Sequence, residues 1–178
     1  MLTDIIVLAF LKIAPRHGYD IRKHVDRILT GPRKLNTNLL YPSLHRLEKQ
    51  GAVEREDCKQ NGKRSRHMYR ITAEGERRFL RMISDFGETE AEKDEEFTVR
   101  VAFFEFLDRT DRMNILERRR EALRNRVALR RSRRESVAEV YSSPWIERII
   151  EHREKRNLDE LSWIDELASL SAEEAHRE

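Results

Sequence analysis

The hydrophobic period of this sequence changes directly after Gly51, and that change constrains the fold more than any other feature. Before Gly51, apolar residues recur at helical spacing in three short segments. After it, residues alternate with a period of two around Val53, and Asn61-Gly62 is a strong signal for a tight hairpin turn. The sequence therefore predicts three helices followed by a two-stranded hairpin.

The ends of the three predicted helices are marked by residues that stop or start helices. Pro15 ends the first helix, and Gly31-Pro32 ends the second. Asn36-Thr37-Asn38 offers three consecutive residues that favour an N-cap, and Gly51 closes the segment that follows. We therefore expect the third helix over residues 37–50.

The segment after the hairpin turn predicts a returning strand and a fourth helix. His67, Tyr69 and Ile71 alternate onto one face of the strand. Thr72 is placed to cap a helix that carries Phe79 and other apolar residues at helical spacing. Three helices plus a two-stranded wing, closed by a further helix, is the order of a winged helix-turn-helix.

The second half of the chain predicts further helices. Acidic residues dominate 85–96, which we interpret as a domain boundary. Residues 97–107 are apolar on nearly every side and predict a buried helix, although a strand stays open for so short a run. A long helix is expected from Arg112 until Ser142-Ser143-Pro144, and a last helix from Trp145 to about Leu170. The fold class is thus mainly α, with a winged helix in residues 1–84 and a helical dimerisation domain in 85–178.

The two halves of the chain differ in the sign of their net charge. Residues 1–72 hold 15 Lys and Arg against 7 Asp and Glu, whereas the remaining residues hold 21 against 26. A basic front domain favours a polyanionic partner. The single cysteine excludes an internal disulfide, and no apolar run is long enough to cross a bilayer, so we expect no membrane association and a cytoplasmic protein.

The third predicted helix has one apolar and one polar face. Leu40, Leu44 and Leu47 define the face expected to be buried. Because Pro42 lacks an N–H, we expect it near the first turn. Asn pairs with adenine, and Arg or Lys with guanine, while Thr and Tyr bind phosphates. The residues predicted to contact DNA from this helix are Thr37, Asn38, Tyr41, Pro42, His45, Arg46 and Lys49.

The hairpin offers a second DNA contact. Lys59, Lys63, Arg64 and Arg66 cluster around its turn, where a wing over residues 57–66 would follow a neighbouring groove or phosphate row. Lys63, Arg64 and Arg66 are the wing residues we predict to bind DNA. Helix and wing together predict a protein that binds double-stranded DNA.

Three segments of the sequence resemble the PadR family of bacterial transcription regulators. They are Gly18-Tyr19-Asp20-Ile21, Leu40-Tyr41-Pro42-Ser43-Leu44-His45-Arg46-Leu47-Glu48 followed by Gly51, and Tyr69-Arg70-Ile71-Thr72-Ala73-Glu74-Gly75. The resemblance covers residues 1–80 and implies a repressor that binds an inverted-repeat operator as a homodimer. The long second half is similar to the larger PadR subfamily, whose last helices pair across the dimer. Small phenolic compounds are the family's best-known ligands, but no residue here identifies a small-molecule effector.

Three features of the sequence have a second interpretation. Nine arginines between Arg118 and Arg134 could form a second DNA contact, but we favour a salt-bridged helix because Glu is interleaved and the acidic segment 85–96 is available as a partner. We expect Trp145 and Trp163 to pack in a core rather than line an effector pocket. We interpret His17, Asp20 and His24 as ordinary surface rather than a metal site.

Two other classes of protein remain as alternatives to a DNA-binding regulator. A helical adaptor on a winged-helix scaffold would bind protein instead of DNA, and a neutral or acidic third helix would mark it. The sequence shows no nucleophile triad, paired carboxylates or phosphate loop, so we predict neither an enzyme nor a cofactor.

Overall fold

The computed structural model describes residues 2–28, 37–58, 66–140 and 143–174, and within these ranges it leaves out the side chains of 24–28, 37–38, 58, 66, 130–131, 133–140 and 174. The chain divides into two compact units. Met1–Asp85 and Val99–Phe106 form the first, and Phe86–Thr98 and Leu107–Glu178 form the second. The segment 99–106, which we expected in the C-terminal domain, thus clusters with the winged helix.

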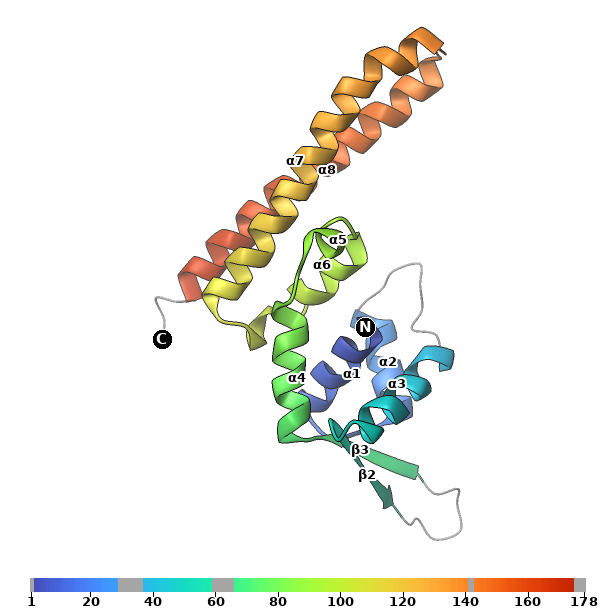
Figure 1. The fold of residues 1–178 in the computed structure, drawn as a ribbon, viewed down its shortest axis with the longest axis vertical. Coiled ribbons are helices and arrows are strands. Elements are labelled where there is room, and N and C mark those ends of the chain that lie inside the picture. The colour runs from blue at the N-terminus through green and yellow to red at the C-terminus, as the bar shows by residue number, and fades with distance from the viewer. Residues whose placement is uncertain (1, 29–36, 59–65, 141–142, 175–178) are drawn as a thin grey trace. The chain divides into compact units, whose positions relative to one another are not determined.

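The first unit has the element order that the period change predicts (Figure 1). Its helices before the sheet are α1 (Leu2–Ile13), α2 (Gly18–Ile28) and α3 (Thr37–Lys49). Its strands are β1 (Arg16–His17), β2 (Val53–Cys58) and β3 (Arg66–Ile71), and α4 (Ala73–Ser84) follows them. The strand order is β1-β3-β2, with both pairs antiparallel.

α1 forms the centre of the first unit's core. Its residues from Asp4 to Leu11 are all buried, because a helix that is apolar on nearly every side must be covered on every side. It contacts α3, α4 and β3. Phe10 meets Phe103 edge to face at a centroid distance of 6.0 Å, so the 99–106 segment completes this core.

The wing differs from its prediction by one strand. We expected two strands, but β1 adds a third by pairing Arg16 with Tyr69 and His17 with Met68. Two residues are too few to show a period of two, so no pattern in the sequence could indicate this strand. Pro15 ends α1 and leaves the next residues extended beside β3.

The second unit contains α5 (Glu88–Ala91), most of α6 (Asp94–Val101), α7 (Arg109–Val140) and α8 (Pro144–Glu174). The last residues of α6, from Val99, and the 3-10 turn at Phe104–Phe106 belong to the first unit. Figure 1 shows α8 running back along α7 as an antiparallel pair. Leu116 and Leu123 of α7 and Ile164 of α8 are fully buried. The predicted interruption is confirmed, since α7 ends at Val140 and α8 begins at Pro144. Asp108 caps the start of α7 by accepting from the Asp111 N–H at 2.8 Å.

Two expectations for this half were wrong. Residues 97–107 do not form one helix: α6 begins earlier, at Asp94, and ends at Val101 before the 3-10 turn. Its first turn carries three acids, which favour a helix N-terminus through the helix dipole. Trp145, which we expected in a core, has 79% of its surface exposed.

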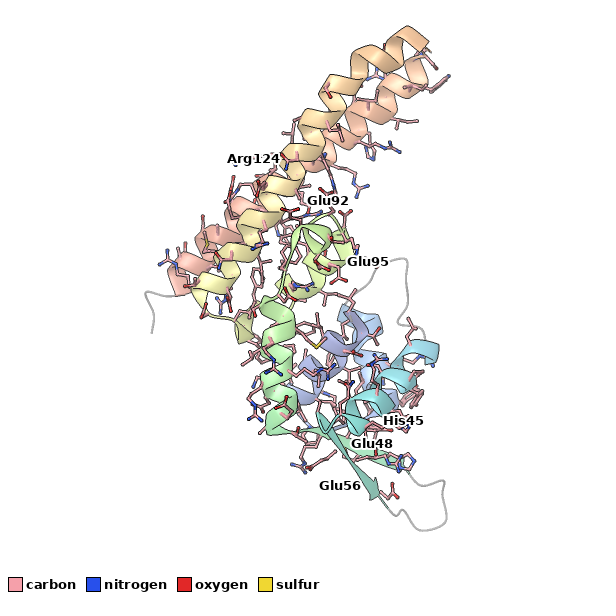
Figure 2. The ribbon with its side chains drawn as sticks, viewed as in Figure 1. His45, Glu48, Glu56, Glu92, Glu95 and Arg124 are labelled. Carbon is pink, nitrogen blue, oxygen red and sulfur yellow. The ribbon has the colours of Figure 1, made fainter. Side chains whose placement is uncertain are left out.

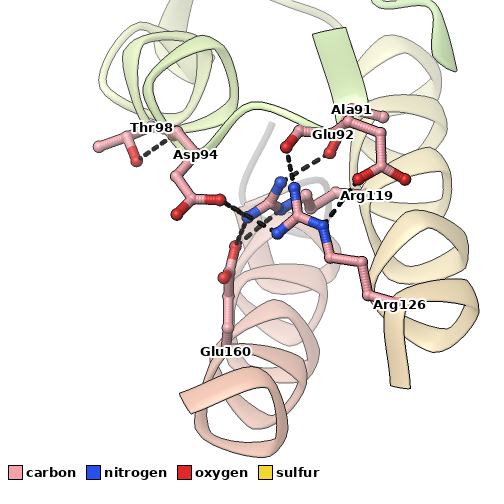
Figure 3. A network of polar contacts seen from close by, with 7 residues as sticks. All are labelled: Ala91, Glu92, Asp94, Thr98, Arg119, Arg126 and Glu160. Carbon is pink, nitrogen blue, oxygen red and sulfur yellow. Dashed lines mark hydrogen bonds and ion pairs between the residues drawn. The ribbon is translucent and has the colours of Figure 1, made fainter. Parts of the chain in front are cut away.

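Among the described arginine side chains of α7, Arg119, Arg120, Arg124 and Arg126 form salt bridges, as we interpreted this helix (Figure 3 shows Arg119 and Arg126). The side chains of Arg130, Arg131, Arg133 and Arg134 are not described. The Arg119 side chain is fully buried and binds Asp94 and Glu160 at 2.7 and 2.6 Å, and it also donates to the Ala91 carbonyl. Arg126 pairs with Glu92 at 2.7 Å. Acids of the 85–96 segment are therefore partners of these arginines. The chain passes from the first compact unit to the second at the start of this segment, after Asp85.

Candidate nucleic-acid interface

α3 has the two faces that its sequence predicts. Leu40, Leu44 and Leu47 are at most 1% exposed and pack into the first unit. On the other side Tyr41 is 48% exposed, and four more side chains that we predicted to contact DNA are also exposed: Pro42, His45, Arg46 and Lys49. Five of the seven helix residues predicted for DNA binding thus lie on the solvent side of one helix.

The other predicted DNA-binding residues are only partly visible. Thr37 and Asn38 lie in the first turn of α3, but their side chains are not described. Arg66 begins β3, and its side chain is likewise not described. Lys63 and Arg64 lie outside the described residues, as does Lys59. The basic charge expected at the wing tip therefore belongs to a part of the chain without structural description.

Pro42 lies deeper in its helix than we expected. It is the sixth residue of α3 rather than part of the first turn. The helix therefore lacks one internal N–H···O=C bond in its second turn. Packing of the buried leucine face holds the helix together in spite of the missing hydrogen bond. The position of Pro42 therefore depends on tertiary contacts, which the preference of proline for the first turn does not take into account.

Two glycines fix the C-terminal end of α3. Gly51 has φ of +68°, the left-handed conformation that commonly ends a helix. The next residue, Ala52, donates to the Leu47 carbonyl at 2.9 Å. At Gly75, a Cβ would lie 2.0 Å from the Ala52 carbonyl oxygen, so α4 crosses this turn in direct backbone contact. Thr72 adds a bond from its hydroxyl to the Gly51 carbonyl at 2.6 Å and accepts from the Gly75 N–H.

A third glycine brings α2 against α3. A Cβ at Gly18 would lie 3.0 Å from the Tyr41 ring and 3.4 Å from Leu44. α2 therefore starts in close contact with α3, which orients the Tyr41 ring. Several residues of the three family-like segments thus serve the packing around α3.

A row of charged and ionisable side chains runs from α3 across the sheet, and it starts at His45 and Glu48 (Figure 2). Glu48 lies 3.8 Å from His45 and 3.6 Å from Arg55 of β2. Arg55 also lies 3.9 Å from Asp57, which contacts His67 of β3 at 2.6 Å. Sequence reasoning missed this row, because it considered only the cations. Its acids offset part of the basic charge beside α3.

Tyr69 is a core residue of the same region. It is 7% exposed, and burial raises the pKa of its phenol above 10.0, although the charge of Arg55 acts in the opposite direction. The hydroxyl is therefore neutral at physiological pH. Its place in the family-like strand segment reflects packing beneath the sheet.

The most informative residue that sequence reasoning missed is Asp4 of α1. Its side chain is 6% exposed and forms an ion pair with Nη2 of Arg46. Ser43 of α3, itself buried, donates its hydroxyl to the same carboxylate oxygen. An acid in an otherwise apolar helix was the available signal. Arg46 is thus tied to the core at one nitrogen, while 47% of its side chain stays exposed.

The described residues contain no group of three or more metal-binding side chains. No helix in the described ranges combines the length and the apolar character required to cross a membrane.

Comparison with known families gives one match, and it lies in the first unit. Residues 7–81 match the model of the transcriptional regulator PadR-like family. Among proteins of curated function, no relative was found. The match covers the whole winged helix apart from its ends.

Solved structures with a similar chain include several regulators. PadR of Bacillus subtilis in complex with operator DNA shares 18% identity, covers 96% of this chain and 99% of its own, and gives a TM-score of 0.46. A PadR-like transcriptional regulator from Bacillus cereus shares 22% identity over 96% and 99%, with a TM-score of 0.42. A transcriptional regulator from Clostridium thermocellum shares 28% identity over 45% and 75%, also with a TM-score of 0.42. The family-model match over residues 7–81 covers fewer than half of the residues of the chain.

Proposed function

We propose that this protein is a repressor that binds an inverted-repeat operator as a homodimer, because residues 7–81 match the model of the transcriptional regulator PadR-like family. In this proposal α3 enters the major groove and the wing over residues 57–66 contacts the neighbouring backbone. The observation that carries the proposal is the solvent face of α3, where Tyr41, His45, Arg46 and Lys49 lie opposite a fully buried leucine face.

The chemistry of this face favours DNA over a protein partner. Arg46 and Lys49 are cations with guanine-binding donors, and Tyr41 has a hydroxyl suited to phosphate. An adaptor that had lost DNA binding would not need cations on this face. The acids of the neighbouring charge row, Glu48 and Asp57, are paired with Arg55 and His67.

The dimer in this proposal is supported by α8. Trp145, Ile149 and Leu170 on this helix are 79%, 50% and 54% exposed. Trp145 and Ile149 lie one turn apart, and neighbouring exposed apolar side chains of this size are typical of an association surface. A symmetric dimer would supply the second half-site for an inverted repeat.

The proposal is tested by selecting duplexes from a random-sequence library with the full-length protein and measuring affinities by fluorescence anisotropy. We expect an enriched palindromic sequence and a salt-sensitive affinity for it. Arg46→Ala or Asn38→Ala should relax the sequence preference, whereas Lys63→Ala or Arg64→Ala should weaken binding to all duplexes alike. A uniform loss from all four changes would contradict the division between helix and wing.

A further inference from the structure

The two described hydrogen bonds to the buried carboxylate of Asp4 both come from α3. Ser43 donates its hydroxyl, and Arg46 donates from Nη2, both to Oδ1. Asp4 is 4% exposed and Ser43 is 1% exposed. A charge at this depth requires partners, because burying an unpaired carboxylate is costly. The carboxylate therefore holds both side chains in place.

This contact changes what Arg46 can do. A free arginine on a helix surface loses side-chain rotamer entropy when it binds. Here the pair with Asp4 restricts the guanidinium before any ligand arrives, and about half of the side chain stays exposed at 47%. A guanidinium has five N–H donors in a planar fork. One nitrogen on Asp4 thus leaves donors for a second acceptor on the exposed side.

We propose that Asp4 is a positioning residue that makes Arg46 selective for guanine. Guanine presents two acceptors, O6 and N7, to a bidentate arginine in the major groove. A guanidinium held from behind by Asp4 meets these acceptors in a fixed orientation, so other bases are rejected more strongly than by a mobile cation. This inference rests on the proposed function, since it requires α3 to enter the major groove.

A purely structural role for Asp4 makes a different prediction. If the pair only stabilised the fold, Asp4→Asn would lower the unfolding temperature and leave the sequence preference as it was. The preference itself, the affinity ratio between the selected duplex and duplexes with single guanine replacements, is therefore the deciding readout. Circular dichroism and thermal unfolding report separately on the fold.

The experiment measures this ratio for the wild type, Asp4→Asn, Arg46→Gln and the double variant. Asp4→Asn should reduce the ratio at one guanine by about tenfold, which is the size of a lost bidentate contact. In the Arg46→Gln background the same change should alter the ratio by less than about twofold, because the group it positions is gone. Ser43→Ala is the matched control: it removes the other donor to Asp4, keeps the ion pair, and should leave the ratio within about twofold of wild type.

Three results would overturn the inference. Asp4→Asn could keep the wild-type ratio at every guanine, or it could lower the ratio equally with and without Arg46. If Asp4→Asn does not fold, Arg46→Lys replaces it, since lysine keeps a cation beside Asp4 but lacks the planar fork. A Lys variant with the full guanine preference is the third contradicting result. A wild type without any sequence preference would instead defeat the proposed function itself, so the two failures are distinguishable.

Discussion

Gly75 shows how a single residue fixes the geometry of the winged helix. A side chain at this position would place Cβ 2.0 Å from the Ala52 carbonyl oxygen and 2.8 Å from Ile71. Because the nearest atom is backbone, Gly75→Ala should destabilise the protein by about 3 kcal/mol or more. Urea unfolding followed by circular dichroism measures this loss.

Gly87→Ala is the control for that change. A Cβ there would meet only the carboxylate end of Glu90, at 3.1 Å, and a flexible side chain can move aside. Its loss should stay below about 1 kcal/mol. Equal losses at Gly75 and Gly87 would show that the close approach at Ala52 does not limit the fold.

Residues within one motif have different roles, which the sequence could not separate. Gly51, Thr72 and Gly75 hold the turn beneath α3, whereas His45 lies on its exposed face. Helical spacing assigned the leucine face correctly because burial repeats with the helix period. The pair between Asp4 and Arg46 joins residues 42 positions apart, so no local pattern could predict it.

At the scale of elements, the buried Arg119 holds α7 to α8 and to the segment before α6. Its side chain is fully buried and binds Asp94, Glu160 and the Ala91 carbonyl. Arg119→Met should lower the free energy of unfolding by about 2 kcal/mol or more, because the methionine removes the described donor to Glu160 and to the buried Ala91 carbonyl.

Arg124 provides the matched control for Arg119, since it lies on the same helix but is 65% exposed and 3.9 Å from Glu117. Arg124→Met should cost less than about 1 kcal/mol, as exposed ion pairs do. Chemical denaturation of both variants tests the difference. If the Arg119 and Arg124 variants were equally stable, the buried network would not hold this unit together.

Asp94 gives the same network a pH dependence. Burial would raise the pKa of its carboxyl, but hydrogen bonds and charges from Arg119 and Arg126 outweigh it and hold the pKa below its ordinary value. A carboxyl with a lowered folded-state pKa stabilises the fold above about pH 4, and this contribution is lost as the pH falls through the folded-state pKa.

Asp94→Asn isolates this pH effect. The variant should be less stable than wild type at about pH 7, and the difference should shrink as the pH falls below about 4. Denaturant midpoints of wild type and variant at about pH 7 and below about pH 4 measure this difference in stability. Asp159→Asn is the control, because Asp159 is exposed. A difference that stayed constant over this range would mean that Asp94 is not held ionised by the arginines.

The long helices could be predicted from the sequence, whereas the shortest elements could not. The periodic segments that became α1, α3, α7 and α8 were long enough to show a helix face. β1 has two residues and α5 has four, and each is formed by contacts with distant parts of the chain. The start of α6 was missed because we interpreted its acids as part of a domain boundary. The arginines that bind these acids lie on α7, so no local pattern indicates the helix.

At the scale of the whole molecule, the exposed apolar residues of α8 predict the oligomeric state. Trp145 and Ile149 lie one turn apart, so replacing both by Ala should weaken the dimer by about tenfold or more in dissociation constant. Sedimentation velocity over a concentration series measures this shift. Leu158→Ala is the control, because Leu158 is 55% exposed but lies on the opposite face from Ile149.

A dimer unaffected by the double change at Trp145 and Ile149, or equally weakened by Leu158→Ala, would place the association surface elsewhere. A wild-type protein that stayed monomeric at all concentrations would remove the dimer from the proposal. The winged helix would then have to bind a single half-site.

The most direct test of the central claim is the affinity of the full-length protein for its selected duplex and for an unrelated duplex of equal length, measured by anisotropy over a salt series. We predict that the selected duplex binds about a thousandfold more tightly, and that both affinities fall as salt rises because phosphate contacts release counterions. Equal affinity for both duplexes, or an affinity that does not change with salt concentration, would contradict the proposal that α3 and the wing bind DNA.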